Sequence, residues 1–231
     1  MTPFALQRAD QFRSAPPPAL GSAAYAAAFD EVKAKGRKGS AARTADETAY
    51  AHYWYEFSDI GWNRIGRVAA ADRGLGLQST ARLMALVNVA MADGYLAGWD
   101  AKYHYDFWRP YTAIRAADFD LNDATTPDAA WEPELATPPV QDYPSTHSVL
   151  GAAAAEVLAA VLGDHTTFTM QSPSAIPANS PRTFTSFRQA AAENAASRVM
   201  AGIHFRFATK AGLEMGRDVG QWTVAKQLRR K

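Results

Sequence analysis

The sequence predicts an all-α fold, in which a helical bundle follows an extended N-terminal arm. Three observations predict it: apolar residues recur at helical spacing, alanine-rich runs are frequent, and no segment alternates as a strand does. A chain of 231 residues with 48% hydrophobic content can also bury one sizeable core without disulfides. We therefore expect residues 1–22 to form the arm and residues 23–231 to form a single helical domain.

The first half of the chain begins with a segment that cannot be helical, because Pro16–Pro18 are consecutive prolines. Further on, Thr44 with Asp46 and Glu47 suits the first turn of a helix. Glycines at 36, 39, 74 and 76 interrupt the helical pattern. The helices expected here are Ala23–Lys35, Thr44–Phe57, Gly61–Asp72 and Leu77–Tyr103.

The second half contains a long segment of different character, Asp118–Tyr143, with seven acidic residues, no lysine or arginine and four prolines. We expect a loop there, and long ordered loops in compact domains usually build functional sites. Thr166–Arg182 is expected to be a second loop. The helices expected around these loops are Thr146–Leu162, Thr183–His204 and Lys210–Leu228.

Composition excludes several classes of function. The net charge is +1, with 24 basic and 23 acidic residues, which argues against binding to nucleic acid. There is no cysteine, so disulfide scaffolds, thiolate metal sites and cysteine nucleophiles are excluded. The N-terminus lacks the apolar core of a signal peptide, and the most apolar runs carry Asp93 and Glu156. We expect a soluble protein without a membrane span, in an unassigned compartment.

Lys102 and Arg109 form the first segment that suits an anion. They are seven residues apart, which places them on nearly the same face of a helix, and Pro110 pushes Arg109 toward an extended conformation. Two cations at a helix end can clamp an anion. Taken alone, the segment is explained more simply as a pair of surface charges, because the spacing of lysine and arginine is weak evidence.

The second segment that suits an anion lies at the start of the expected helix Thr146–Leu162. Ser145 is a natural N-cap, and the free N–H groups of a first helical turn attract an oxyanion. His147 lies in that first turn and could exchange a proton with the anion. The alternative is a simple cap beside an exposed histidine.

The third segment joins Ser197, Arg198 and His204, which we expect on the helix Thr183–His204. Ser197 and His204 are seven residues apart and would share a face, with Arg198 within reach because its side chain is long. Gly202 permits another element to pack closely. The alternative is a buried histidine with a hydrogen-bond partner and a solvated arginine.

Together the three segments favour one compact, highly charged oxyanion over separate surface features. No carboxylate cluster with metal-ligand spacing accompanies them, which disfavours a bare divalent cation. Among the other histidines, His52 and His165 are expected at the surface. His104 is expected near the pocket, without a role.

The order of the motifs K-x6-R-P, P-S-x-H and S-R-x5-H resembles that of the vanadium-dependent haloperoxidases and the type 2 phosphatidic acid phosphatase superfamily to which they belong. The blocks here are Lys102…Arg109-Pro110, Pro144-Ser145-Thr146-His147 and Ser197-Arg198…His204. The resemblance implies an all-α catalytic bundle of the haloperoxidase and acid phosphatase type. It implies vanadate as cofactor, with phosphate or sulfate able to occupy the same site.

The resemblance also implies roles for individual residues. The oxygens of vanadate would be held by Lys102, Arg109, Ser145, the Thr146 N–H and Arg198. His204 would be the axial ligand to vanadium, and His147 the acid–base partner. Lys102 would also polarise the peroxide, and Trp99 would line the halide side of the pocket.

Two departures from the family pattern affect the pocket. Thr146 stands where the family usually has glycine; its N–H is retained, but its side chain narrows the approach. Val140, five residues before Ser145, stands where a chloroperoxidase would have an aromatic residue. The halide is therefore not assigned by the motif, although bromide is preferred over chloride.

Two further points concern carboxylates. Ala208, four residues after His204, stands where phosphatases commonly place an aspartate that orients the histidine, which weakens a phosphatase assignment. The resemblance also implies a carboxylate partner for Arg198 from the preceding helical region, and we expect Glu56 or Asp59 to supply it.

The favoured function is a haloperoxidase that oxidises halide with hydrogen peroxide to hypohalous acid, which then attacks a small organic acceptor. The alternatives are a phosphomonoesterase that forms a phosphohistidine at His204 and a non-catalytic module that binds phosphate. Family haloperoxidases carry an additional N-terminal helical bundle. Its absence here would expose an apolar face, so a homodimer is expected.

Overall fold

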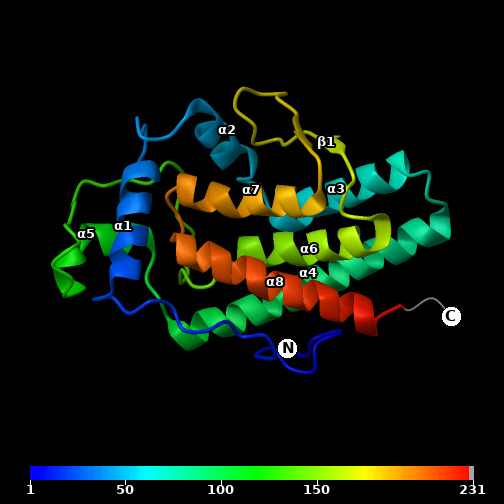
Figure 1. Ribbon diagram of the computed structural model, residues 1–231, viewed down its shortest axis with the longest axis horizontal. Coiled ribbons are helices and arrows are strands. Elements are labelled where there is room, and N and C mark those ends of the chain that lie inside the picture. Colours follow the sequence, from blue (N-terminus) through cyan, green and yellow to red (C-terminus); the bar gives the residue numbers. More distant parts are fainter. Residues whose placement is uncertain (229–231) are drawn as a thin grey trace.

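The computed structural model describes residues 1–228 and is mainly helical, which confirms the predicted fold class. The helices are α1 (Ala23–Lys35), α2 (Ala45–Tyr53), α3 (Ser58–Asp72), α4 (Leu77–Tyr105), α5 (Pro110–Arg115), α6 (Thr146–Leu162), α7 (Phe187–Met200) and α8 (Arg206–Lys226), with a 3₁₀ turn at Ala117–Phe119. Helix α6 packs against α4, α7 and α8, and the four run side by side (Figure 1). The start of α6 faces the end of the bundle where α1 and α5 lie.

Close contact between α6 and α8 depends on three glycines spaced four residues apart, Gly212, Gly216 and Gly220. A Cβ atom at Gly216 would lie 2.2 Å from the carbonyl oxygen of Val149, and one at Gly212 would lie 2.5 Å from that of Ser145. The two helix backbones therefore touch, which no larger residue would permit. This contact fixes the position of the first turn of α6.

The N-terminal arm is tied to α4 by one buried carboxylate. Both oxygens of Asp93 accept hydrogen bonds from the backbone N–H groups of residues 4–6, at 2.7, 2.6 and 2.8 Å. Further along the arm, the hydroxyl group of Tyr143 donates to the carbonyl oxygen of Ala15 at 2.6 Å. Residues 1–22 contain no helix, as predicted, but they are held by specific contacts with the bundle.

The expectation that no strand is present was wrong for one pair of short strands. Strand β1 (Phe168–Met170) pairs antiparallel with β2 (Arg182–Phe184), with Phe168 opposite Phe184. Three residues are too few to show a convincing alternation in sequence. The rings of Phe168 and Phe184 lie 5.4 Å apart within the pair, and the ring of Phe168 also stacks on that of Phe187 of α7 at 5.2 Å.

The bounds of several helices also differ from expectation, by up to four residues at α2, α7 and α8. Helix α2 ends at Tyr53 rather than Phe57, and α7 covers Phe187–Met200 rather than Thr183–His204. After α7 the chain turns at Gly202, which has a φ of +78° and approaches α1 so closely that a Cβ would lie 2.3 Å from the Gly36 carbonyl oxygen. His204 therefore lies in the α7–α8 loop, and it does not share a helical face with Ser197. Over residues 1–228, none of the helices combines the length and apolarity needed to cross a bilayer.

Candidate active site

The candidate site lies at the start of α6 and gathers side chains from five parts of the chain. Lys102 is in the last turn of α4, Arg109 precedes α5, Arg198 is in the last turn of α7, and His204 is in the loop before α8. Arg109, Arg198 and His204 line a cavity of about 660 Å³, whose lining does not include the buried side chain of Lys102. Of the residues singled out from the sequence, its lining includes Trp99, Arg109, Val140, Thr146, His147, Arg198 and His204.

Lys102 is fully buried, and its ammonium group is held by the backbone of the long acidic loop. Nζ donates to the carbonyl oxygens of Gln141 at 2.6 Å and Asp142 at 2.9 Å. Burial, together with the nearby charge of Arg109, lowers the pKa of Lys102 to about 7. The lysine can therefore gain or lose its charge near neutral pH.

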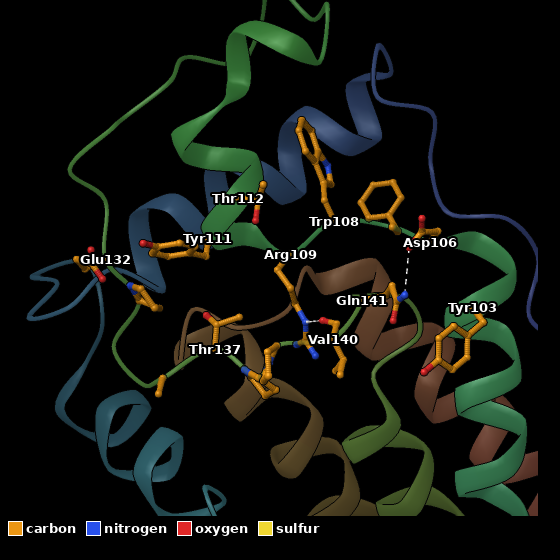
Figure 2. A pocket seen from close by; sticks show the side chains of 15 residues that line it. Tyr103, Asp106, Trp108, Arg109, Tyr111, Thr112, Glu132, Thr137, Val140 and Gln141 are labelled. Atoms are coloured by element: carbon orange, nitrogen blue, oxygen red, sulfur yellow. Dashed lines mark hydrogen bonds between the residues drawn. The ribbon is translucent and has the colours of Figure 1, made fainter.

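Arg109 links that loop to the loop that carries His204. Its Nε donates to the carbonyl oxygen of Val140 at 2.7 Å, as Figure 2 shows, and Nη1 donates to that of Ile203 at 2.6 Å. Nη1 also lies 3.0 Å from Nε2 of His204. Because a guanidinium can only donate, Nε2 accepts with its lone pair, and the proton of the neutral imidazole sits on Nδ1.

Asp142 is a site residue that the sequence analysis missed. Its carboxylate is fully buried, and Oδ1 lies 2.7 Å from Nδ1 of His204 and 3.9 Å from Nη1 of Arg109. Burial raises the pKa of Asp142 above its ordinary value, although the charges of Arg109 and Lys102 oppose the shift. Asp142 gives His204 the carboxylate neighbour that Ala208 cannot supply. The only signal in sequence is its place directly before the Tyr143-Pro144-Ser145 segment.

His147 and Arg198 meet at the carbonyl oxygen of Trp54, just beyond the end of α2. Nε2 of His147 lies 3.0 Å from this oxygen, and Nη1 of Arg198 donates to it at 3.4 Å. A carbonyl only accepts, so Nε2 of His147 carries the proton and Nδ1 is left with its lone pair. Burial and the charge of Arg198 hold the pKa of His147 well below its ordinary value. His147 is therefore a neutral base.

The expected carboxylate partner of Arg198 was assigned wrongly. Glu56 forms an ion pair with Arg64 at 2.7 Å, Asp59 is exposed, and no carboxylate within residues 1–228 lies at ion-pair distance from Arg198. The guanidinium lies 5.7 Å from the centre of the Tyr55 ring, and Nε has no hydrogen-bond partner. Burial, aided by the charge of Arg109, lowers the pKa of Arg198 to about 9. A buried cation without a counter-charge fits an anionic ligand.

The donor set as a whole suits vanadate. Three buried cations, Lys102, Arg109 and Arg198, are accompanied by one buried carboxylate, Asp142. Ser145 caps α6 by accepting a hydrogen bond from the N–H of Ser148 at 3.4 Å, so the positive end of that helix adjoins the same site. Within the described chain, no group of three His, Asp or Glu residues could hold a bare metal ion. Positively charged groups therefore outnumber carboxylates at the site, which favours an oxyanion as its ligand.

Thr146 is accommodated by a glycine on the facing helix. A Cβ atom at Gly98 of α4 would lie 2.7 Å from Cγ2 of Thr146. The threonine methyl group thus occupies space that only glycine leaves open. The side chain is half-buried at the cavity wall, where it narrows the approach to the first turn of α6.

The remaining histidines lie outside the site. His165 is exposed, as expected. His52 is half-buried, with Nε2 3.0 Å from Glu134, so it is not a simple surface residue. His104 is exposed, lies 3.3 Å from Arg13 and does not line the cavity, contrary to expectation.

A second cavity, of about 720 Å³, lies on the other side of Arg109 and Val140, which line both cavities. Figure 2 shows Arg109 between Tyr111, Thr137 and Val140, with Tyr103 on the neighbouring helix α4. Arg109 and Val140 therefore each border two cavities.

Comparison with known proteins relates the chain to one family. The sequence model of the VCPO second helical-bundle domain matches residues 82–230. The vanadium chloroperoxidase of Curvularia inaequalis is 31% identical over 140 residues, which cover 49% of this chain and 22% of that protein.

Solved structures agree with this result. A bacterial vanadium-dependent iodoperoxidase superimposes with a TM-score of 0.85 and 33% identity, over 98% of this chain and 56% of that one. A bacterial vanadium-dependent chloroperoxidase in its holo form superimposes with a TM-score of 0.76 over 96% of this chain and 52% of that one. Its identity is 16%, so it supports the fold alone.

This chain thus spans about half the length of the similar structures, and less of the curated relative. These comparisons do not favour the phosphatase alternative. Because the family model covers well over half of the sequence, the chain belongs to the vanadium haloperoxidase family.

Proposed function

We propose that residues 23–231 form the catalytic domain of a vanadate-dependent haloperoxidase, which oxidises bromide or iodide with hydrogen peroxide more readily than chloride. The observation that carries the proposal is the charge of Arg198, which no carboxylate of residues 1–228 compensates and which is buried at a cavity that Arg109, His147 and His204 also line. Family membership supports the same reaction.

In this proposal vanadate is held by Lys102, Arg109, Ser145, the Thr146 N–H and Arg198, with His204 as the ligand to vanadium. When bound, the vanadate supplies a Lewis-acidic centre at which peroxide becomes reactive toward halide without a change in metal oxidation state. The hydrogen bond from Arg109 to Nε2 assigns the proton of His204 to Nδ1, beside Asp142, and Nε2 would bind the vanadate with the lone pair that accepts from Arg109 in this structure.

His147 and Lys102 would handle protons and charge. His147 is neutral, and its Nδ1 can accept a proton from the incoming peroxide. Lys102, protonated below about pH 7, stabilises negative charge that develops on the peroxide oxygen. Lys102 is fully buried and His147 is half-buried, which strengthens both effects.

The halide preference rests on two observations. Val140 is an aliphatic residue in the cavity wall, beside Trp99. The similar bacterial structure at 33% identity is an iodoperoxidase. Iodide and bromide are also easier to oxidise than chloride. The acceptor is proposed to be a small organic molecule, and a homodimer is proposed for the assembly.

To test the proposal, the chain is loaded with vanadate and supplied with hydrogen peroxide, a phenol dye and each halide in turn. We expect halogenation of the dye with iodide and bromide, and none with His204→Ala. Hydrolysis of a phosphomonoester is measured in parallel and is expected to be absent. Vanadate that is demonstrably bound but supports no halogenation would overturn the proposal.

A further inference from the structure

We propose that Tyr95, at the rim of the active-site cavity, is halogenated by the product of the site itself. The inference rests on the proposed haloperoxidase function and adds a covalent modification site to it. Tyr95 lies on α4 and lines the same cavity as His147, Arg198 and His204.

The position of Tyr95 on α4 relates this phenol ring to the candidate site. Tyr95 precedes Lys102 by seven residues, so the two project from nearly the same face of α4, about 10 Å apart along its axis. Tyr95 is 48% exposed, so its ring is open to the solvent through which a product leaves. Hypohalous acid that leaves the cavity can therefore meet this ring.

The aromatic neighbours select Tyr95 over Trp99. The Trp99 ring lies between two tyrosines on the same helix, with its centre 6.1 Å from that of Tyr95 and 5.7 Å from that of Tyr103. An electrophile attacks an aromatic ring through its face, and Trp99 is half-buried with a tyrosine on either side, whereas Tyr95 is exposed. Tyr95 is the end of this row of three rings that lies at the active-site cavity. Among the described residues, Trp99 is its one neighbour in the row.

The chemistry needs no reagent beyond those of the proposed reaction. The ring donates an electron pair from the carbon ortho to its hydroxyl group to the halogen of hypohalous acid, and the halogen–oxygen bond breaks. The ring C–H bond then breaks, and its proton combines with the released hydroxide to form water. One hypohalous acid and one tyrosine give one halotyrosine and one water.

Tyr103 is a matched control within the same helix and the same aromatic row. It is more exposed than Tyr95, at 68%, but lines the second cavity instead of the active-site cavity. An oxidant that reacts after escape into bulk solvent would label Tyr103 at least as fast as Tyr95. An oxidant that reacts near its source would label Tyr95 first.

The experiment supplies the vanadate-loaded chain with peroxide, bromide and excess free methionine, which consumes hypohalous acid in the bulk, and measures bromotyrosine by peptide mass spectrometry. Because proximity raises the local concentration of oxidant, we expect at least about threefold more label on Tyr95 than on Tyr103. Tyr95→Phe should abolish the label on its peptide, and Tyr103→Phe should leave the label on Tyr95 in place.

Two outcomes would overturn the inference, and a separate sample without methionine and with a phenol dye tells them apart. If the dye is brominated while Tyr95 is unlabelled, or labelled no more than Tyr103, the modification site is wrong and the proposed function stands. If neither the dye nor the protein is brominated although vanadate is bound, both proposals fail.

Discussion

Oδ1 of Asp142 lies 2.7 Å from Nδ1 of His204, and both side chains are buried at the candidate vanadate site. On the other side of the imidazole, Nη1 of Arg109 lies 3.0 Å from Nε2. The hydrogen bond from Arg109 assigns the tautomer of the ring, and the carboxylate of Asp142 lies at ion-pair distance from its Nδ1. Asp142 is therefore a positioning residue for His204.

Removing this carboxylate should weaken vanadate binding. We expect Asp142→Ala to lower vanadate affinity about 10- to 100-fold, because His204 loses the carboxylate that lies against Nδ1 and helps to orient the ring. Titration with vanadate measures the affinity, and its pH profile should shift as well. Glu156→Gln is the matched control, since Glu156 is also buried but is paired with Arg188. Wild-type affinity and pH profile in Asp142→Ala would contradict this role.

Anion binding should weaken as the pH rises through neutrality. The pKa of Lys102 is lowered to about 7, so its charge is present below that pH and lost above it. Sulfate is a suitable probe because it keeps both charges over this range. We expect its affinity to fall about fivefold between pH 7 and pH 8, as one proton is lost from the site.

The substitution Lys102→Arg tests the assignment of this pH dependence. A guanidinium stays protonated far above neutral pH, so the fall in affinity near pH 7 should become markedly smaller. Calorimetric titration at several pH values provides the measurement. An unchanged pH profile in the variant would show that another group is responsible.

Loss of His147 should affect the reaction more than ligand binding. We expect His147→Ala to lower kcat about 10²- to 10⁴-fold, the usual contribution of an acid–base group. Vanadate affinity should change little, because the ring is neutral and donates to the carbonyl oxygen of Trp54. His104→Ala is the control, since that ring is exposed. Equal losses of affinity and of kcat would argue for a binding role.

The contact between Gly98 and Thr146 predicts a coupled effect on stability. Gly98→Ala would place a Cβ 2.7 Å from Cγ2 of Thr146. A β-branched side chain in a helix moves with difficulty, so we expect a loss of about 1–3 kcal/mol. The double variant Gly98→Ala, Thr146→Gly should recover most of it. Urea unfolding of the four proteins measures the coupling, and strictly additive effects would be evidence against the contact.

The N-terminal arm should depend on Asp93. Its carboxylate accepts three backbone hydrogen bonds in a buried position, so Asp93→Ala should cost at least about 2 kcal/mol. Amide exchange at residues 4–6 should accelerate at the same time. Asp100→Ala removes a half-buried ion pair to Arg13 of the same arm and should cost less than about 1 kcal/mol. Slow exchange at residues 4–6 in Asp93→Ala would contradict this anchoring role.

Much of the fold could be predicted because its signals are local. The bounds of α1 and α6 agree with expectation, since each begins at a serine cap and ends at a glycine. The spacing Gly212, Gly216 and Gly220 was also visible in sequence, but only the structure shows that it brings the α8 backbone onto α6.

The site was harder to predict where it depends on contacts that are distant in sequence. The position of His204 in a loop follows from the close approach of Gly202 to Gly36, which no helical periodicity encodes. Asp142 was one of seven acidic residues in its loop, and burial beside His204 alone distinguishes it. The partner expected for Arg198 was wrong because Glu56 is taken by Arg64.

The central claim is that the buried cations and His204 surround one tetrahedral oxyanion. Its most direct test is a crystal structure of the chain soaked with vanadate, in which anomalous scattering locates the vanadium. We predict a peak in the cavity between Nε2 of His204 and the guanidinium of Arg198, with its oxygens facing Lys102 and Arg109. A cavity without such a peak, at concentrations where vanadate binds in solution, would contradict the account.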